Sequence, residues 1–309
     1  MSRAEEGLKS EHLTEALSRA LAGDGARLAD LLARFGGLPG PRPNHALAAA
    51  FGDVVGALDG ELRARAAKVL TAIGADDAAP DTARVFLPVA AAFGWTARLR
   101  TVKSRGDVAA AERALMELAA DERAPVRAGA IAALVEHAAR GHADALVVLM
   151  GEQLAEEDRE RRWGALGTLL EAFTDKRAIA SLTTGRDALL EHVTALIVDL
   201  ADAPRAAERS DARRRALLAL GPAVSAMTAA FRDVGIAWLE ARCSEAKHPD
   251  LRRSLDTALS RLRARGDALR PEELARLGEA LASSAKPPRD PSRIRDGTGR
   301  GKKRARRGA

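Results

Sequence analysis

Apolar and polar residues alternate along much of the chain with the period of an α-helix, most clearly in DERAPVRAGAIAALVEHAA (121–139). Its apolar residues Val126, Ala130, Ala133 and Leu134 stand at offsets 0, +4, +7 and +8. This spacing places them on one face of a helix. The stretch therefore predicts a tight turn followed by a helix with one buried face.

The same pattern recurs at four other places in the chain. These weaker copies start at Leu62, Arg161, Ala212 and Leu251. In every copy the residue after the first position is an arginine, and these anchor arginines are Arg63, Arg127, Arg162, Arg213 and Arg252. Five matches to one register predict an internal repeat.

One further helical stretch lies between successive copies, for example at 108–120 and 189–201. Residues 85–100 are a candidate degenerate unit in the widest gap between copies. Pro222 is expected to end one helix, with the next formed by 223–242. Two helices per unit of about 40 residues are typical of a helical solenoid.

We therefore predict an all-α protein in which residues 1–285 form an α-solenoid of about six to seven antiparallel helix pairs. The segment APVRAGAIAALV, with Asp121 six residues before Arg127, resembles the second helix of a HEAT repeat. The resemblance covers roughly residues 44–285 and implies HEAT-like repeats. Members of that family are known as protein–protein scaffolds, and a minority act on DNA. A resemblance in fold does not by itself assign a function.

The basic charge of the chain is concentrated at its end. Residues 286–309 contain ten Lys or Arg and two Asp, a net charge of +8, and the remaining residues carry −2. This segment is rich in Pro, Gly and Ser, so we expect a disordered tail. The cations near its end can attract the phosphates of a nucleic acid without recognising a base sequence, or can simply aid solubility. They are Lys302, Lys303, Arg304, Arg306 and Arg307.

The composition argues against a disulfide-bonded, secreted or membrane-spanning protein. The chain has one cysteine, Cys243, and no Tyr, and its aromatic content is 3%. A single cysteine excludes an intramolecular disulfide and favours a reducing, cytoplasmic compartment. We expect no secretory signal, because MSRAEEGLKS is polar, and no membrane span, because no apolar run approaches the ~18 residues required.

The anchor arginines lie in the first turn of their predicted helices, where a cation opposes the helix dipole. Their recurrence, with an acid such as Asp121 upstream, favours a structural role in bracing the turns. The alternative is a basic groove on the concave face that contacts a partner or a nucleic acid. Its candidate residues are Arg159, Arg161, Arg214, Arg215 and Arg253.

Trp163 is a further candidate contact, since it stands among charges in RERRWGAL. HEAT-like DNA glycosylases use tryptophans and an acid to hold a damaged nucleotide. Here no acid follows Trp95, Trp163 or Trp238 by one helical turn, which favours core packing for all three.

No pattern indicates a catalytic or metal centre. His137 and His142 stand five residues apart across a glycine, without an HExxH motif or a cysteine pair. We expect no cofactor and no metal. The sequence favours a non-catalytic scaffold that binds a protein partner; the alternatives are a nucleic-acid-binding protein and a HEAT-like alkylbase DNA glycosylase.

Overall fold

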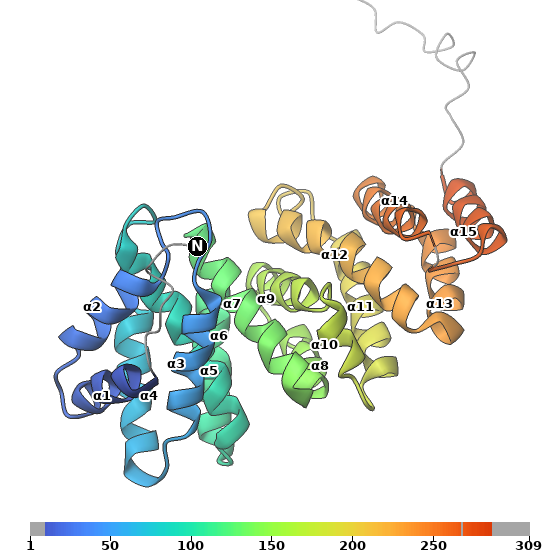
Figure 1. The fold of residues 1–309 in the computed structure, drawn as a ribbon. Coiled ribbons are helices and arrows are strands. Elements are labelled where there is room, and N and C mark those ends of the chain that lie inside the picture. The colour runs from blue at the N-terminus through green and yellow to red at the C-terminus, as the bar shows by residue number, and fades with distance from the viewer. Residues whose placement is uncertain (1–9, 267, 286–309) are drawn as a thin grey trace, which may run out of the picture.

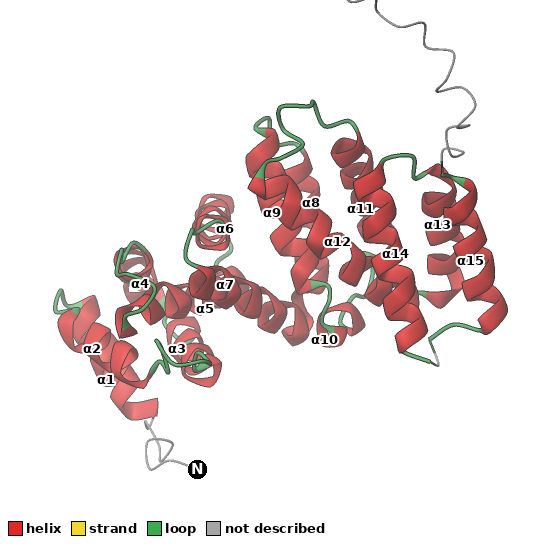
Figure 2. Cartoon of the chain, turned by 90° about the horizontal axis from the view of Figure 1, so that it is seen from above, coloured by secondary structure: helices red, strands yellow, loops and turns green. Residues whose placement is uncertain are grey.

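The computed structural model describes residues 10–266 and 268–285, apart from the side chains of Ser10 and Asp233, and contains helices and no strand in this part (Figures 1 and 2). The all-α fold class is therefore confirmed. The tail predicted over 286–309 lies outside the described residues and stays a prediction.

The α-helices have the following bounds. They are α1 (Ser10–Leu21), α2 (Ala26–Phe35), α3 (His45–Gly56), α4 (Gly60–Gly74), α5 (Phe86–Thr101), α6 (Arg105–Ala119), α7 (Ala124–His137), α8 (Ala143–Leu154), α9 (Arg159–Ala172), α10 (Lys176–Ala180), α11 (Arg186–Ala201), α12 (Asp211–Ala230), α13 (Arg232–Glu245), α14 (Pro249–Ala264) and α15 (Pro271–Ser283). A 3-10 turn at Ala83–Val85 precedes α5, and a π-helical turn at Ala138–His142 joins α7 to α8.

Helix α5 lies at the centre of the N-terminal part of the molecule (Figure 1). All of its residues from Phe86 to Arg98 are buried, as is typical of a helix that is apolar on every side. It packs against α2, α3, α4, α6 and α7. The candidate unit at 85–100 is therefore one central helix with neighbours all round, not one side of a helix pair.

From α7 onward the helices form two rows. Helices α7, α9, α12 and α14 pack one against the next, and a second row pairs α8 with α11 and α13 with α15 (Figure 2). Four of the five anchor arginines lie on the helices of the first row, and we call these the arginine helices. The HEAT-like solenoid stays our interpretation of this arrangement.

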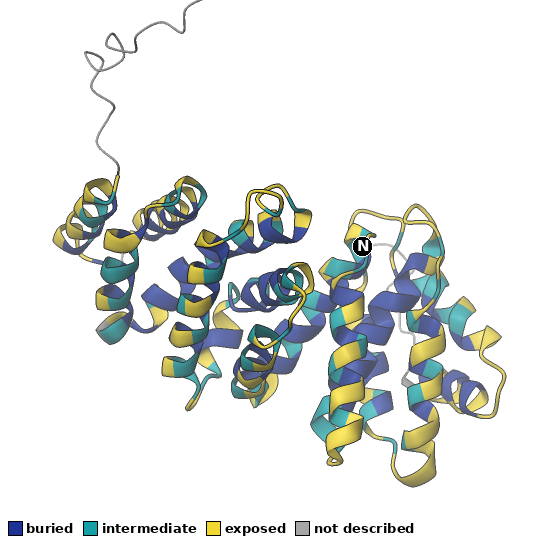
Figure 3. Ribbon diagram, turned by 180° about the vertical axis from the view of Figure 1, so that it is seen from behind, coloured by how far each residue is buried: buried dark blue, intermediate teal, exposed yellow. Residues whose placement is uncertain are grey.

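The apolar register of the repeat is buried in most copies, and Figure 3 shows the buried positions where helices face one another. Val126, Ala212 and Leu251 are all buried at the first position. Leu62 is instead 43% exposed, and Arg161 is exposed too. Helix α4 packs mainly against α5 and α1, so its first turn has no neighbour to cover Leu62.

Pro222 does not end a helix, contrary to the prediction. Helix α12 runs through it to Ala230, and the break before α13 falls at Phe231. Proline removes one amide donor, which leaves the carbonyl of Leu218, four residues earlier, without its helical partner. Leu218 is 68% exposed, so water can reach this turn and the helix continues.

Glycines bring the arginine helices close together. A Cβ on Gly167 of α9 would lie 3.1 Å from the Cα of Ala216 on α12. A Cβ on Gly221 of α12 would lie 2.6 Å from the carbonyl oxygen of Ser254 on α14. Only glycine permits this second approach, which fixes the spacing of α12 and α14.

Among the helices described, none is long and apolar enough to cross a membrane.

Candidate functional site

The anchor arginines reach back to the turns that precede their helices. In four copies the guanidinium donates to a backbone carbonyl five or six residues earlier in the chain. The pairs are Arg63 with Leu58, Arg127 with Asp121 and Glu122, Arg162 with Glu156, and Arg213 with Glu208. Each arginine thus ties the start of its helix to the turn before it.

For Arg127, Arg162 and Arg213 the upstream acids contribute their backbone carbonyls to these contacts, and not their carboxylates. The carboxylate of Asp121 accepts hydrogen bonds from Arg123, at 2.9 Å from Nε and 2.6 Å from Nη2. Burial raises the pKa of Asp121, but the hydrogen bonds from Arg123 outweigh it and lower the pKa overall. Arg252 differs from the other anchors, because its guanidinium forms no hydrogen bond to the turn before its helix among the described residues and donates instead to the carbonyl of Leu281 at the end of α15.

Arg213 is the most deeply buried anchor, with 1% of its surface exposed. Its Nε and Nη2 donate to the carbonyl of Leu200 at 3.3 and 3.1 Å, and its Nη1 donates to the carboxylate of Asp250 at 2.8 Å. That hydrogen bond lowers the pKa of Asp250. One side chain therefore joins the end of α11, the turn before α12 and the start of α14.

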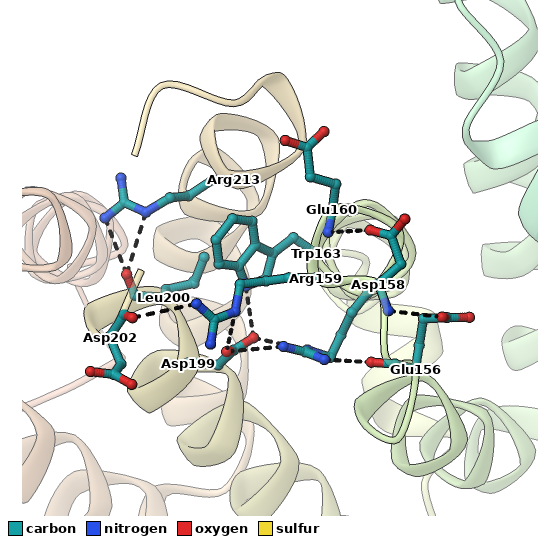
Figure 4. A network of polar contacts seen from close by, with 10 residues as sticks. Glu156, Asp158, Arg159, Glu160, Trp163, Asp199, Leu200, Asp202 and Arg213 are labelled. Atoms are coloured by element: carbon teal, nitrogen blue, oxygen red, sulfur yellow. Dashed lines mark hydrogen bonds and ion pairs between the residues drawn. The ribbon is translucent and has the colours of Figure 1, made fainter. Parts of the chain in front are cut away.

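Trp163 lies in a second polar network, around the carboxylate of Asp199 on α11 (Figure 4). Its Nε1 donates to this carboxylate at 2.8 Å. Arg162 donates to the same group at 2.9 and 3.1 Å, and Arg159 pairs with it at 3.3 Å. The guanidinium of Arg159 also lies 5.8 Å from the centroid of the Trp163 ring.

Two residues that the sequence suggested as partner contacts, Trp163 and Arg159, therefore interact within the protein itself. Trp163 is fully buried and its N–H has an acceptor. Its indole therefore presents neither a face nor a donor at the surface. Arg159 is held over the ring by Asp199. Trp95 is also buried, and the Nε1 of the half-buried Trp238 donates to Thr194.

The other arginines that the sequence suggested as partner contacts lie in different places on the protein. Arg161 is exposed beside α6 and α8, 3.8 Å from Asp158, and Arg215 is half-buried with an Nε that has no partner. Arg214 and Arg253 are brought together between α12 and α14. The cluster at the end of the tail, Lys302 to Arg307, lies outside the described residues.

The space between α12 and α14 is a groove of about 330 Å³, which we call the α12–α14 groove. Its floor contains Leu217, Gly221 and Ser254, whose Oγ donates to the carbonyl of Leu217 at 2.8 Å. The exposed Leu218 lines one wall. The groove therefore has an apolar surface, and the hydrogen bond from Ser254 to Leu217 fixes the distance between the two helices that form it.

The rim of the α12–α14 groove is cationic. It contains Arg209, Arg214 and Arg253. Arg214 pairs with Asp211, whereas the side chains of Arg209 and Arg253 form no hydrogen bond or ion pair with any described residue; the positive charge of Arg253 only adds to that of Arg213 in lowering the pKa of Asp250. Arg213 and Asp250, which also line the groove, neutralise one another. The groove thus offers unpaired positive charge beside an exposed leucine, and of its two acids Glu208 is the one that forms no ion pair with a described residue.

Sequence reasoning missed two residues of this groove. Leu218 stands outside the apolar register of its helix, so its exposure could have been read from the spacing. Arg209 precedes the helix in an irregular turn, and no periodicity identifies it.

The cysteine and the histidines offer weaker candidates for a functional site than the α12–α14 groove. Burial raises the pKa of the Cys243 thiol to about 12, so the reactive thiolate is scarce at neutral pH. The rings of His137 and His142 stack with centroids 4.8 Å apart. Over residues 10–266 and 268–285, no three His, Cys, Asp or Glu side chains are grouped so as to hold a metal ion.

Comparison with protein-family models and with curated protein sequences finds no match to this chain. A functional assignment therefore depends on the geometry of the chain's own surfaces.

Proposed function

We propose that this chain is a non-catalytic binding scaffold of HEAT-like helical repeats, and that its α12–α14 groove holds an acidic segment of a protein partner. One observation carries the proposal: exposed Leu218 lines the same groove as Arg209 and Arg253, whose side chains form no hydrogen bond or ion pair with the residues that the structure describes. A lone buried cysteine fits a reducing compartment, so we propose a cytoplasmic location.

The chemistry of the groove favours a protein segment over a nucleic acid. An exposed leucine gains stabilisation from an apolar side chain, at roughly 25 cal/mol for each Å² removed from water, and gains nothing from a phosphate backbone. Arginine is enriched among the residues that dominate binding at protein interfaces. An acidic segment with one large apolar residue would satisfy both features at once.

The floor of the groove is rigid, which also favours binding. Gly221 holds α12 and α14 in close approach, and Ser254 bridges them with a hydrogen bond. Arg213 joins both helices to α11. A surface that is already ordered loses less entropy when a partner binds.

Nucleic-acid binding is the second candidate, and the net charge of +8 on 286–309 favours it. Such binding would weaken steeply with salt, because it depends on the release of counterions. The DNA glycosylase alternative depends on Trp163, which is buried, and no observation favours it.

Selection from a random peptide library displayed on phage tests the proposal with the full chain as the target. We expect the selected peptides to be enriched in Asp and Glu around one large apolar residue. Their binding should fall about tenfold or more in Arg253→Glu, since the substitution reverses a charge at the rim. The matched control is Arg261→Glu, which changes an exposed arginine further along α14 and outside the groove.

Two results would reject the proposal. One is a selection without acidic or apolar enrichment. The other is a set of peptides whose binding responds equally to Arg253→Glu and Arg261→Glu. Binding of an unrelated duplex oligonucleotide that depends on Arg253 would favour the nucleic-acid alternative instead.

A further inference from the structure

A second groove, of opposite charge, lies between α6, α8 and α9. Its volume is about 590 Å³, and we call it the acidic groove. Its apolar lining includes Met116 and Leu149. Around this lining stand the carboxylates of Glu112 and Glu117 on α6 and of Glu152 on α8.

These carboxylates lack cationic partners among the residues that the structure describes. Within the described part of the chain, Glu112, Glu117 and Glu152 form no side-chain hydrogen bond or ion pair. Burial raises the pKa of Glu112, and the nearby charge of Glu152 raises it further. Two of the lining residues, Arg113 and Arg161, are cationic. The following segment, 153–160, makes the field more negative, with four acids and one arginine.

We propose that the acidic groove is the docking site of the chain's own basic segment 286–309. The segment carries ten cations against two acids, and KKRARR at 302–307 is its densest cluster. The charges are complementary: the groove has acids without ion pairs among the described residues, and no acid stands within five residues of the cluster at 302–307 in the sequence. This inference is independent of the α12–α14 groove.

The segment is long enough to reach the acidic groove. Along the contacts α15–α14, α14–α12, α12–α9 and α9–α8, four helix spacings of about 8–10 Å each give a path of roughly 40 Å. The cluster at 302–307 begins 16 residues after Lys286, and an extended chain of that length spans about 50 Å. The cations can therefore enter the groove with slack in the connection.

Attachment to the same chain also makes a weak contact sufficient. A short flexible connection gives an effective concentration on the order of 1 mM. A contact with a dissociation constant of about 100 µM between separate molecules would then be about 90% formed within one chain. Both lysines of the cluster, Lys302 and Lys303, would lie close to the glutamates of the groove.

Zero-length cross-linking of the full chain with a water-soluble carbodiimide tests the docking. At about 1 µM, where contacts between molecules are rare, we expect amide bonds from Lys302 or Lys303 to Glu112, Glu117 or Glu152. Mass spectrometry of digested protein identifies them. About 0.5 M NaCl should abolish them, because the Debye length then falls below 5 Å.

An equal mixture of ordinary and ¹⁵N-labelled chains distinguishes docking within one chain from docking on a second copy. Isotopically pure cross-links support the proposal, and mixed ones overturn it. Cross-links spread over exposed acids elsewhere, such as Glu61 on α4 and Asp187 on α11, would also overturn it.

Two variants complete the test. Arg304→Glu/Arg306→Glu/Arg307→Glu keeps both lysines and changes no described residue, and we expect it to reduce the cross-links roughly tenfold. Glu112→Gln/Glu152→Gln should reduce those to Glu117, whereas the control Glu272→Gln on α15 should not. Unchanged cross-linking in the arginine variant would refute the docking, whatever the result of the peptide selection.

Discussion

Replacing Asp199 with alanine should destabilise the protein more than any other single carboxylate change on α11. This carboxylate accepts hydrogen bonds from Trp163 and Arg162 and pairs with Arg159, so it joins α11 to α9 (Figure 4). The substitution removes all of these contacts at once. It leaves the N–H of Trp163 buried without an acceptor.

The size of the loss in stability can be worked out from the groups that lose their partner, the N–H of Trp163 and the guanidinium of Arg162. A buried donor without an acceptor costs about 1–3 kcal/mol. Removal of one partner from a buried ion pair costs about 3–5 kcal/mol, less where water reaches the remaining charge. Arg162 is 14% exposed and keeps its bond to the carbonyl of Glu156. We therefore predict a loss of about 3 kcal/mol for Asp199→Ala, and about 1.5 kcal/mol for Asp199→Asn, whose amide oxygen still accepts from Trp163.

Urea denaturation followed by circular dichroism and tryptophan fluorescence measures this loss. The control is Asp187→Ala on the same helix, which removes an exposed ion pair with Arg186 and should cost about 0.5 kcal/mol or less. If Asp199→Ala and Asp187→Ala agree within about 0.5 kcal/mol, then the network does not join α9 to α11 as described.

Three further predictions use the same denaturation measurement. Arg213→Met should cost about 2–3 kcal/mol, because it removes both donors of the Leu200 carbonyl and the arginine partner of Asp250, whose carboxylate is 37% exposed and so is partly stabilised by water; a loss below about 1 kcal/mol would contradict the bridging role. Gly221→Ala should destabilise by about 1–3 kcal/mol, since the new Cβ meets the carbonyl of Ser254, although alanine is the better helix former by about 1 kcal/mol; a stabilised variant would refute the close approach. Burial, followed by nearby positive charge, lowers the pKa of His137 from 6.5 to about 3. The unfolded chain then binds a proton that the folded chain does not, so stability should fall as the pH drops from about 6.5 toward 3. His137→Gln should flatten that part of the pH profile, and an unchanged profile would show that His137 titrates normally.

The sequence was sufficient to predict the all-α class and several helices, because their apolar spacing repeats. The copy around Arg127 matches helix α7 closely, and its buried residues include the predicted Val126, Ala130, Ala133 and Leu134. The role of Pro222 was mispredicted. A proline's local effect depends on whether water reaches the freed carbonyl, and that depends on tertiary packing.

The candidate site was predictable only in part. Arg214 and Arg253 were identified as cations near the repeat anchors, but their approach depends on the spacing that Gly221 and Ser254 impose between two helices. Trp163 was expected in the core, and its acceptor Asp199 lies 36 residues away in another helix. Such a contact between distant segments leaves no local signature in a single sequence.

The most direct test of our central claim, binding of an acidic segment in the α12–α14 groove, is a fluorescence-anisotropy titration of a selected peptide. The comparison is between the unmodified chain, Leu218→Asp, and the control Val198→Asp, which alters a comparably exposed residue on α11. We predict that Leu218→Asp weakens binding at least about tenfold, because it removes the apolar contact and places a negative charge in the groove, whereas Val198→Asp has no effect. Equal dissociation constants for all three proteins would contradict the claim.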